Sequence, residues 1–364
     1  MYNIPLCDLK KQYQSLREDM LSAFDQLCQE SAFIKGPYVK EFEQAFCKAH
    51  QSPYGIGCSD GTSAISLALE SLGVGVGDEV ILPSHTFIAT AEAILHVGAT
   101  PIFADIKTND YTIDPSDIEQ KINLHTKAII PVHIYGTPCD MDEIMALAKK
   151  HSLYVVEDCA QAHLAQYKGQ YVGTFGDCGT FSFYPGKNLG AYGDAGFILC
   201  RNQEIETKLR RLVDHGRLGK YDHDILGYNR RLDALQAAIL AVKMPHLESW
   251  TNRRREIAHY YNSELRRLGV KTIEHSDDKK PVYHVYNIEV ANRHHVAASM
   301  LQAGIHTGIH YPEPVHKAPY FQPVDGLKVT EGVSSRIMSL PIYPEMTDDE
   351  VQYVMKELTS AILS

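Results

Sequence analysis

The sequence lacks the features that would place this protein in a membrane or on nucleic acid. No apolar run approaches the roughly 20 residues of a membrane-spanning helix. There is no basic run and the net charge is −10, which argues against nucleic acid as the main partner. The first residues, MYNIPLCDLKKQ, contain no apolar core of a signal peptide, so we expect a cytoplasmic protein.

The sequence also lacks any C-x-x-C pair. Its eight cysteines are scattered over positions 7, 28, 47, 58, 139, 159, 178 and 200. This distribution is typical of buried reduced thiols and argues against a disulfide framework or a zinc site, so we expect no bound metal. Cys159 follows a predicted strand, and a core position is favoured over a nucleophilic role.

Helical and strand-like spacings alternate along most of the chain. Its 364 residues, 44% hydrophobic and 22% charged, are typical of a soluble globular protein of roughly two domains. Apolar spacing predicts helices near 13–29, 63–72, 232–242, 248–268 and 351–362, and strands at 80–82, 101–103, 128–130, 154–156, 180–183 and 197–199. Such alternation predicts an α/β fold with a mostly parallel central sheet that helices cover on both faces.

The pattern changes after about Pro245. A long charged helix there leads into strands near 283–290 and a final amphipathic helix. We therefore expect a large α/β domain over 1–247 and a smaller C-terminal α+β domain over 248–364.

Two charged residues follow predicted strands. Asp158 ends the run LYVVED, and Lys187 lies in a Pro-Gly turn after the strand of FSFYPGKNLG. In a parallel sheet the carboxyl ends of the strands gather ligands. A lysine that holds an aldehyde as an imine and a carboxylate that keeps a pyridine nitrogen protonated are what pyridoxal phosphate (PLP) requires. A surface lysine and a helix-capping aspartate are the alternatives, and Glu157 should point to the other face of its strand.

Further residues could complete a PLP site. Gly61 and Thr62 open a predicted helix whose first N–H groups could bind phosphate, although an ordinary helix cap explains them equally well. Ser182 could add a hydroxyl to the phosphate, and Phe87 could stack on the ring or simply pack in the core. Gln161 lies near Asp158; so does His163, for which a core position is the default.

Six motifs in order resemble the DegT/DnrJ/StrS sugar aminotransferases. They are GTSAI, PSHTFIATA, PVHIYG, VVEDCAQAH, FSFYPGKNLG and GYNRRLDALQAAIL, and the similarity extends from IPLCDL to SLPIYPEMTDDEV. The resemblance implies the aspartate-aminotransferase-like fold of PLP fold type I. It implies that Lys187 binds the cofactor aldehyde, Asp158 the ring nitrogen and Gln161 the phenolic oxygen, that Phe87 stacks on the ring, and that Gly61, Thr62 and Ser182 hold the phosphate.

The same resemblance implies partners and substrate contacts. Asn229 in GYNRR matches an asparagine that reaches the phosphate of the neighbouring subunit, which implies a homodimer with shared active sites. The resemblance also implies substrate-side roles for Tyr184, His310, Tyr311 and His316.

The reaction implied is transfer of an amino group from glutamate to a keto sugar linked to a nucleoside diphosphate. GKNLGAYGDAG and GIHYPEPVH resemble enzymes that aminate carbon 3, and a dTDP-linked keto-deoxyhexose is the favoured substrate. A 4-keto nucleotide-sugar aminotransferase and a non-catalytic regulator of the same fold are the alternatives. Lys187 argues against the related sugar dehydratases, in which a histidine replaces the lysine.

Overall fold

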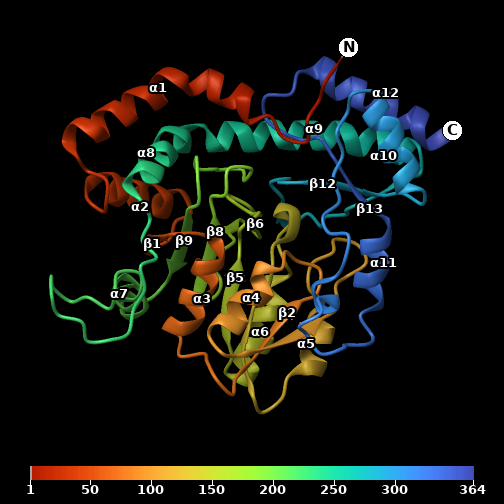
Figure 1. Ribbon diagram of the computed structural model, residues 1–364. Coiled ribbons are helices and arrows are strands. Elements are labelled where there is room, and N and C mark those ends of the chain that lie inside the picture. The colour runs from red at the N-terminus through yellow and green to blue at the C-terminus, as the bar shows by residue number, and fades with distance from the viewer. Residues whose placement is uncertain (1) are drawn as a thin grey trace.

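Seven strands form the central sheet of the computed structural model, which describes residues 2–364 (Figure 1). Their order across the sheet is β1-β9-β8-β5-β4-β2-β3. The pairings among β8, β5, β4, β2 and β3 are parallel, and β9 runs antiparallel to both β8 and β1. The strands are β1 (Tyr54–Cys58), β2 (Glu79–Pro83), β3 (Thr100–Ala104), β4 (Thr126–Ile129), β5 (Tyr154–Asp158), β8 (Cys178–Ser182) and β9 (Gly196–Cys200). The predicted mostly parallel α/β sheet is confirmed.

Sequence patterning missed β1, and the reason is its composition. The strand reads YGIGC, and glycine is depleted in strands. A Cβ at Gly55 would lie 2.4 Å from the Phe197 ring, and one at Gly57 would lie 2.5 Å from Leu232. Close packing therefore requires the two glycines that hide this strand from a pattern search.

Helices cover both faces of the sheet, as its buried strands require. Val80 and Leu82 of β2 face one hydrophobic cluster and Ile81 faces another, so successive side chains alternate between the two layers. Apolar residues of α3, α4 and α7 belong to the first cluster and those of α5 and α6 to the second. The helices of this part are α1 (Leu9–Glu30), α2 (Pro37–Ala49), α3 (Gly61–Ser71), α4 (Ala89–His96), α5 (Pro115–Lys121), α6 (Met141–His151), α7 (Gln203–Leu212) and α8 (Ala234–Lys243).

The helix α1 is longer than predicted. It begins at Leu9 because the Asp8 side chain accepts hydrogen bonds from the N–H groups of Lys10 and Lys11 and so caps the first turn. Leu16 and Met20 of the predicted apolar stripe are buried, but Phe24 is 50% exposed. The apolar stripe of α1 is therefore only partly covered within one chain.

The C-terminal part builds a second hydrophobic core. It contains α9 (Leu247–Arg267), α10 (Arg293–Gln302), α11 (Lys328–Arg336), α12 (Asp348–Leu363) and the antiparallel sheet β10-β12-β13, formed by Lys271–Thr272, Tyr286–Glu289 and Ile337–Leu340. Figure 1 shows α9 along one end of the molecule, with α1 and α8 beside its start and α12 near its far end. Ile4 packs into this second core, so the N-terminus contributes to it, and the division at residue 247 stays a prediction.

Smaller elements complete the chain. A three-stranded sheet pairs β11 (Lys279–Lys280) with β6 (Gln166–Tyr167) and β7 (Gln170–Tyr171), and so links the C-terminal part to the loop after β5. Single 3-10 turns occupy Ile134–Gly136, Met244–His246 and Val315–Lys317. Within residues 2–364, none of the helices combines the length and apolar character needed to cross a membrane.

Glu157 occupies the face of β5 that turns away from Asp158, as predicted. It is fully buried and accepts hydrogen bonds from His133 Nε2 at 3.0 Å and from the backbone N–H groups of Gly173, Phe175 and Gly176, each at 2.8 Å. These bonds tie β5 to the loop that leads into β8. The carboxylate is therefore a structural anchor for the two strands that carry the candidate site.

We expect Glu157→Ala to lower the free energy of unfolding by about 3–5 kcal/mol, because it leaves buried donors without an acceptor. Urea titration followed by circular dichroism measures this loss. Glu119→Ala is the control, because Glu119 pairs with Lys150 on the surface and its removal should leave the midpoint unchanged. Equal midpoints for the two variants would contradict the anchoring role.

Candidate active site

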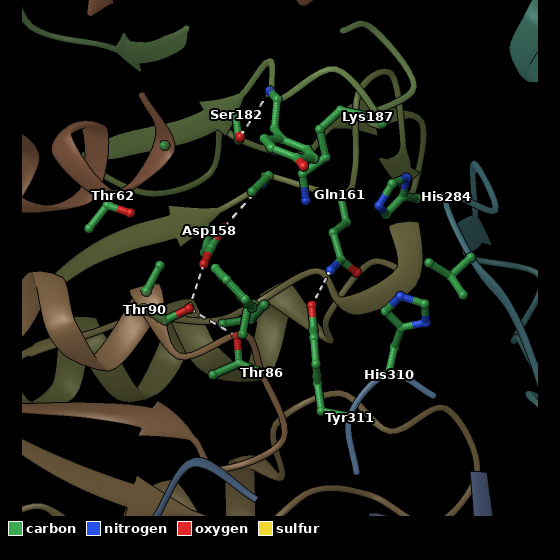
Figure 2. Close-up of a pocket in the computed structure, with 18 of the residues that line it drawn as sticks. Thr62, Thr86, Thr90, Asp158, Gln161, Ser182, Lys187, His284, His310 and Tyr311 are labelled. Carbon is green, nitrogen blue, oxygen red and sulfur yellow. Dashed lines mark hydrogen bonds between the residues drawn. The ribbon is translucent and has the colours of Figure 1, made fainter. Parts of the chain in front are cut away.

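A cavity of about 610 Å³ opens at the carboxyl ends of the parallel strands. Asp158 is the last residue of β5, and Ser182 is the last residue of the neighbouring strand β8. The loop after β2 adds Thr86 and Phe87. The opposite wall comes from the C-terminal part of the chain and includes His284, His310 and Tyr311 (Figure 2).

Lys187 lies in the turn that follows β8. Its backbone N–H donates to the carbonyl of Tyr184 at 2.8 Å, which holds the turn, and its side chain lines the cavity. Burial lowers the pKa of Lys187 to about 8, while the negative charge of Asp158 acts in the opposite direction. Roughly one such lysine in ten is then unprotonated at pH 7, many times the fraction for an ordinary lysine. Lys187 can therefore act as a nucleophile near neutral pH.

Asp158 is 5% exposed and has two donors (Figure 2). Thr90 Oγ1 donates to Oδ2 at 2.8 Å and the N–H of Ala160 donates to Oδ1 at 3.1 Å. Because the Thr90 proton is committed to Asp158, Thr86 must donate its own proton to Thr90 across 2.9 Å. Burial raises the pKa of Asp158, and the two hydrogen bonds and Lys187 oppose that rise. A cationic ring N–H in the cavity would stabilise the ionised carboxylate.

The start of α3 forms a cradle beside Ser182. Asp60 caps the helix by accepting the N–H of Ser63 at 2.7 Å, and within residues 2–364 the N–H groups of Gly61 and Thr62 have no protein acceptor. A Cβ at Gly61 would lie 2.7 Å from Cβ of Ser182, so a side chain there would close the cradle. Free N–H groups at a helix start beside hydroxyl side chains suit a phosphate group.

Gln161 connects the two walls of the cavity. Its Oε1 accepts the N–H of Tyr135 at 2.6 Å, and its Nε2 donates to the hydroxyl of Tyr311 at 2.9 Å (Figure 2). Tyr135 Oη in turn donates to the carbonyl of His310 and contacts His85 Nε2. One Nε2 hydrogen of Gln161 remains to donate into the cavity, which fits a contact with an oxygen of a bound ring.

These residues fit PLP. A carboxylate with spare lone pairs suits the ring nitrogen, and a lysine without a hydrogen-bond partner for Nζ among the described residues suits the aldehyde. The cradle at Gly61, Thr62 and Ser182 suits the phosphate. When bound, the cofactor supplies an electrophilic aldehyde and an electron-withdrawing ring.

The cavity brings together ten of the twelve residues predicted from the sequence. They are Gly61, Thr62, Phe87, Asp158, Gln161, Ser182, Tyr184, Lys187, His310 and Tyr311. Phe87 and Tyr184 are 54% and 61% exposed, so they mark its open side.

His163 and Cys159 lie outside the cavity in an aromatic core beside Phe46 and Phe181. Burial raises the pKa of the Cys159 thiol far above its usual value.

Two predicted residues lie outside the cavity. His316 does not line it, and its substrate-binding role stays a prediction: its Nδ1 lies 2.5 Å from Ser84 Oγ, and its ring packs near Phe103. Its side chain is turned into the packing around β3 and away from the site. Asn229 lies in the segment between α7 and α8, paired with Asp214 through a β-bridge, and its contact with a neighbouring subunit stays a prediction.

Sequence reasoning missed several lining residues. Thr90 is one, and its helical position three residues after Phe87 gave no sign that it would donate to Asp158. Arg254 and His284 are others, and they come from the C-terminal part more than 60 positions after Lys187. The charged helix that carries Arg254 was predicted, but charge alone does not show that one of its arginines is buried in a cavity.

The family model of the DegT/DnrJ/EryC1/StrS aminotransferases matches residues 14–359. The chain belongs to this family. It is therefore a PLP-dependent aminotransferase, and the predicted cofactor and the aspartate-aminotransferase-like fold are confirmed.

Three relatives resemble this aminotransferase over nearly their whole length. A protein of Geobacillus stearothermophilus named as a pleiotropic regulatory protein is 43% identical, covering 98% of both chains. A UDP-N-acetyl-3-dehydro-alpha-D-glucosamine 3-aminotransferase of Acidithiobacillus ferrooxidans is 43% identical over 96% of this chain and 95% of its own. A dTDP-3-amino-3,4,6-trideoxy-alpha-D-glucose transaminase of Streptomyces venezuelae is 38% identical over 94% of this chain and 92% of its own.

A solved structure agrees with this assignment. The crystal structure of DesV from S. venezuelae, in complex with a ketimine intermediate, matches the aminotransferase with a TM-score of 0.96. The sequences are 37% identical, and the match covers 99% of this chain and 98% of that one.

We expect the rate of PLP uptake by the cofactor-free aminotransferase to rise with pH around a midpoint near pH 8, because only unprotonated Lys187 attacks the aldehyde. The measurement is the growth of visible absorbance after PLP is added. Lys187→Ala should give no such absorbance. Asp158→Asn removes the charge that raises the lysine pKa, so the midpoint should move to lower pH; a midpoint near 10 in the unsubstituted protein would contradict the assignment.

Proposed function

We propose that this enzyme transfers the amino group of glutamate to carbon 3 of a keto-deoxyhexose linked to dTDP, and that it does so as a homodimer. The observation that carries the amino-transfer chemistry is the occurrence of Lys187 and Asp158 in one buried cavity with a phosphate cradle. Nucleotide sugars are the substrate class because relatives at 43% and 38% identity carry the names of nucleotide-sugar aminotransferases.

Different observations support amination at carbon 3 and dTDP as the nucleotide. Both of those relatives have names that place the amino group at carbon 3, although one acts on a UDP sugar and the other on a dTDP sugar. The lysine-loop and GIHYPEPVH motifs also favour carbon 3. We favour dTDP because the transaminase of S. venezuelae is named for a dTDP sugar.

Each half-reaction uses the same residues. Lys187 would hold the cofactor, and its Nζ would take the proton from the α-carbon of glutamate. Asp158 would keep the ring nitrogen protonated, and Thr90 fixes the orientation of its carboxylate. In the second half-reaction Nζ would return a proton to the carbon that receives the amino group. A low lysine pKa serves both steps, because the amine must both accept and release a proton near neutral pH.

A regulatory role is the second candidate, because the relative from G. stearothermophilus is named as a regulatory protein. A purely non-catalytic protein would have no need for a buried lysine of lowered pKa beside a carboxylate. We therefore place catalysis first. Amination at carbon 4 is the remaining alternative for the reaction.

Adding glutamate to the PLP-loaded enzyme should remove the visible absorbance of the lysine-bound cofactor, and a keto nucleotide sugar should restore it. The test uses a panel of 3-keto and 4-keto sugars on dTDP and on UDP, followed by stopped-flow spectroscopy. We expect the dTDP-linked 3-keto sugar to restore the absorbance at least about tenfold faster than its 4-keto isomer. Faster recovery with the 4-keto sugar would reassign the carbon, and an unchanged spectrum with glutamate would favour the regulatory role.

Exposed apolar surface supports the homodimer. Leu21, Phe24, Phe33 and Ile34 of α1 and the loop after it are each 45–55% exposed. The segment between α7 and α8 also exposes Leu218, Tyr221 and Leu226, at 66–81%. Figure 1 shows this green segment extending away from the body of the chain. Apolar side chains in such positions are typical of a surface that a second copy covers, and this segment carries Asn229.

If Asn229 completes the site of the other subunit, mixed dimers should recover activity. We expect Lys187→Ala and Asn229→Ala to be impaired separately, and their unfolded and refolded mixture to regain up to one working site per mixed dimer. That site combines Lys187 of one variant with Asn229 of the other. Amino transfer by the mixture that stays at the sum of the separate variants would reject the shared site, as would full activity of a monomer in size-exclusion chromatography.

A further inference from the structure

Arg254 is a buried cation in the wall of the active-site cavity. It lies in α9, is 4% exposed, and lines the same cavity as Lys187. Its Nη1 donates to the carbonyl of Ile342 at 2.7 Å and to those of Tyr283 and His284 at 3.2 and 3.4 Å. Neutral carbonyls are thus its hydrogen-bond partners, and among the described residues no carboxylate lies within ion-pair distance of it.

The guanidinium keeps unused hydrogen-bonding capacity. Its Nε is buried and has no partner in the described part of the chain, and no bond from Nη2 to a protein acceptor is present there. An arginine cannot lose its proton in a protein, so its charge remains. A buried charge without a partner ion is strongly unfavourable, which favours an anionic ligand at this point of the cavity.

The charged groups near Arg254 do not neutralise it, which also favours an anionic ligand. Lys243 is fully buried, donates to the carbonyl of Gly190 at 2.6 Å and forms no salt bridge within residues 2–364. Cys7 also lines the cavity, and the positive charges of Arg254 and Lys243 favour its ionised thiolate. Burial has the larger effect and raises the pKa of the thiol, so Cys7 supplies no negative charge. Glu345 is the acid that faces them, but it is not within 4.0 Å of either cation, and burial raises its pKa.

A short chain of contacts joins Arg254 to the reacting lysine. Asn188 directly follows Lys187, and its Nδ2 donates to the carbonyl of Val282 at 3.1 Å. Its Oδ1 is therefore the acceptor for His284 Nδ1 at 3.2 Å, and the carbonyl of the same histidine accepts from Arg254. Figure 2 shows the His284 ring beside Lys187 on the wall of the cavity. These contacts connect the segment that accepts from the guanidinium to the turn that carries the amine.

We propose that Arg254 binds a carboxylate of the amino donor and is the residue that makes the cavity accept an amino acid. The inference rests on the proposed function, because an amino-acid donor is the anion that must enter this cavity with its amino group at Lys187. Guanidinium and carboxylate match as planar two-bond partners, and exclusion of water strengthens the pair. The nucleotide sugar has no carboxylate to place there when its nucleotide is dTDP and its sugar a keto-deoxyhexose, so the two substrates would use different parts of one cavity.

The test compares Arg254→Gln with Arg255→Gln in the PLP-loaded enzyme. Arg255 is the matched control, because it is the next residue of α9, donates to the carbonyl of Pro281 at 2.9 Å and does not line the cavity. Isothermal titration with glutarate, a dicarboxylate without an amino group, measures binding without turnover. We expect roughly 10- to 100-fold weaker binding in Arg254→Gln and no change in Arg255→Gln.

Kinetics separate a binding role from a structural one. In Arg254→Gln the KM for glutamate should rise by a similar factor, while the KM for the nucleotide sugar and the absorbance of the bound cofactor stay as in the unsubstituted enzyme. Arg254→Lys keeps the charge and should bind glutarate with intermediate affinity, and methylguanidinium should partly restore glutamate use to Arg254→Gln. Should Arg254→Gln not fold, the Lys variant decides: glutarate affinity equal to that of the unsubstituted enzyme overturns the proposal.

Other outcomes are equally decisive. Unchanged glutarate binding in Arg254→Gln, or an equal loss for both substrates together with a lower melting temperature, would mean that the arginine only ties backbone carbonyls together, and the proposal fails. If the unsubstituted enzyme transfers no amino group from glutamate or any other amino acid, the proposed function fails instead. Glutarate binding that still depends on Arg254 would then show that the subsite survives the loss of that function.

Discussion

The electrostatic balance between Lys187 and Asp158 is the interaction on which the rest of this structure depends. Burial alone would make both groups neutral, since it lowers the pKa of the lysine and raises that of the carboxyl. Their mutual attraction and the donors on Asp158 oppose that tendency. The result is an amine that can lose its proton near neutral pH and a carboxylate prepared for a cationic ring, which are the two conditions of PLP chemistry.

The sheet order brings these two groups to one edge. Strands β5 and β8 are parallel neighbours, with Asp158 paired to Thr180, so the turn after β8 projects over the carboxyl end of β5. The buried Glu157 on the opposite face of β5 binds the loop between the same two strands. Glu157 and Asp158 are consecutive residues of β5 with different roles, because side chains alternate between the two faces of a strand. Asp158 lines the cavity, and the carboxylate of Glu157 holds the scaffold.

The second wall of the cavity explains how one site could serve two substrates. It carries neutral polar groups at His284, His310 and Tyr311, and one buried charge at Arg254. Gln161 and Asn188 connect this wall to the cofactor side through hydrogen bonds of 2.9 and 3.2 Å. In this arrangement the large α/β part would hold the cofactor, and the wall from the C-terminal part would bind the substrate. Substrate specificity could then change between relatives while the chemistry stays the same.

By itself the sequence determined the sheet class and the PLP-dependent family, because each depends on short segments. Asp158 ends one strand and Lys187 lies in the turn after another, and the motifs around them are local in the chain. Only the tertiary structure decided that Thr90 serves Asp158, that Arg254 lies in the cavity and that His316 turns away into packing near Phe103. These three features depend on contacts between distant segments and on the direction of side chains. The spacing of residues within one segment predicts neither.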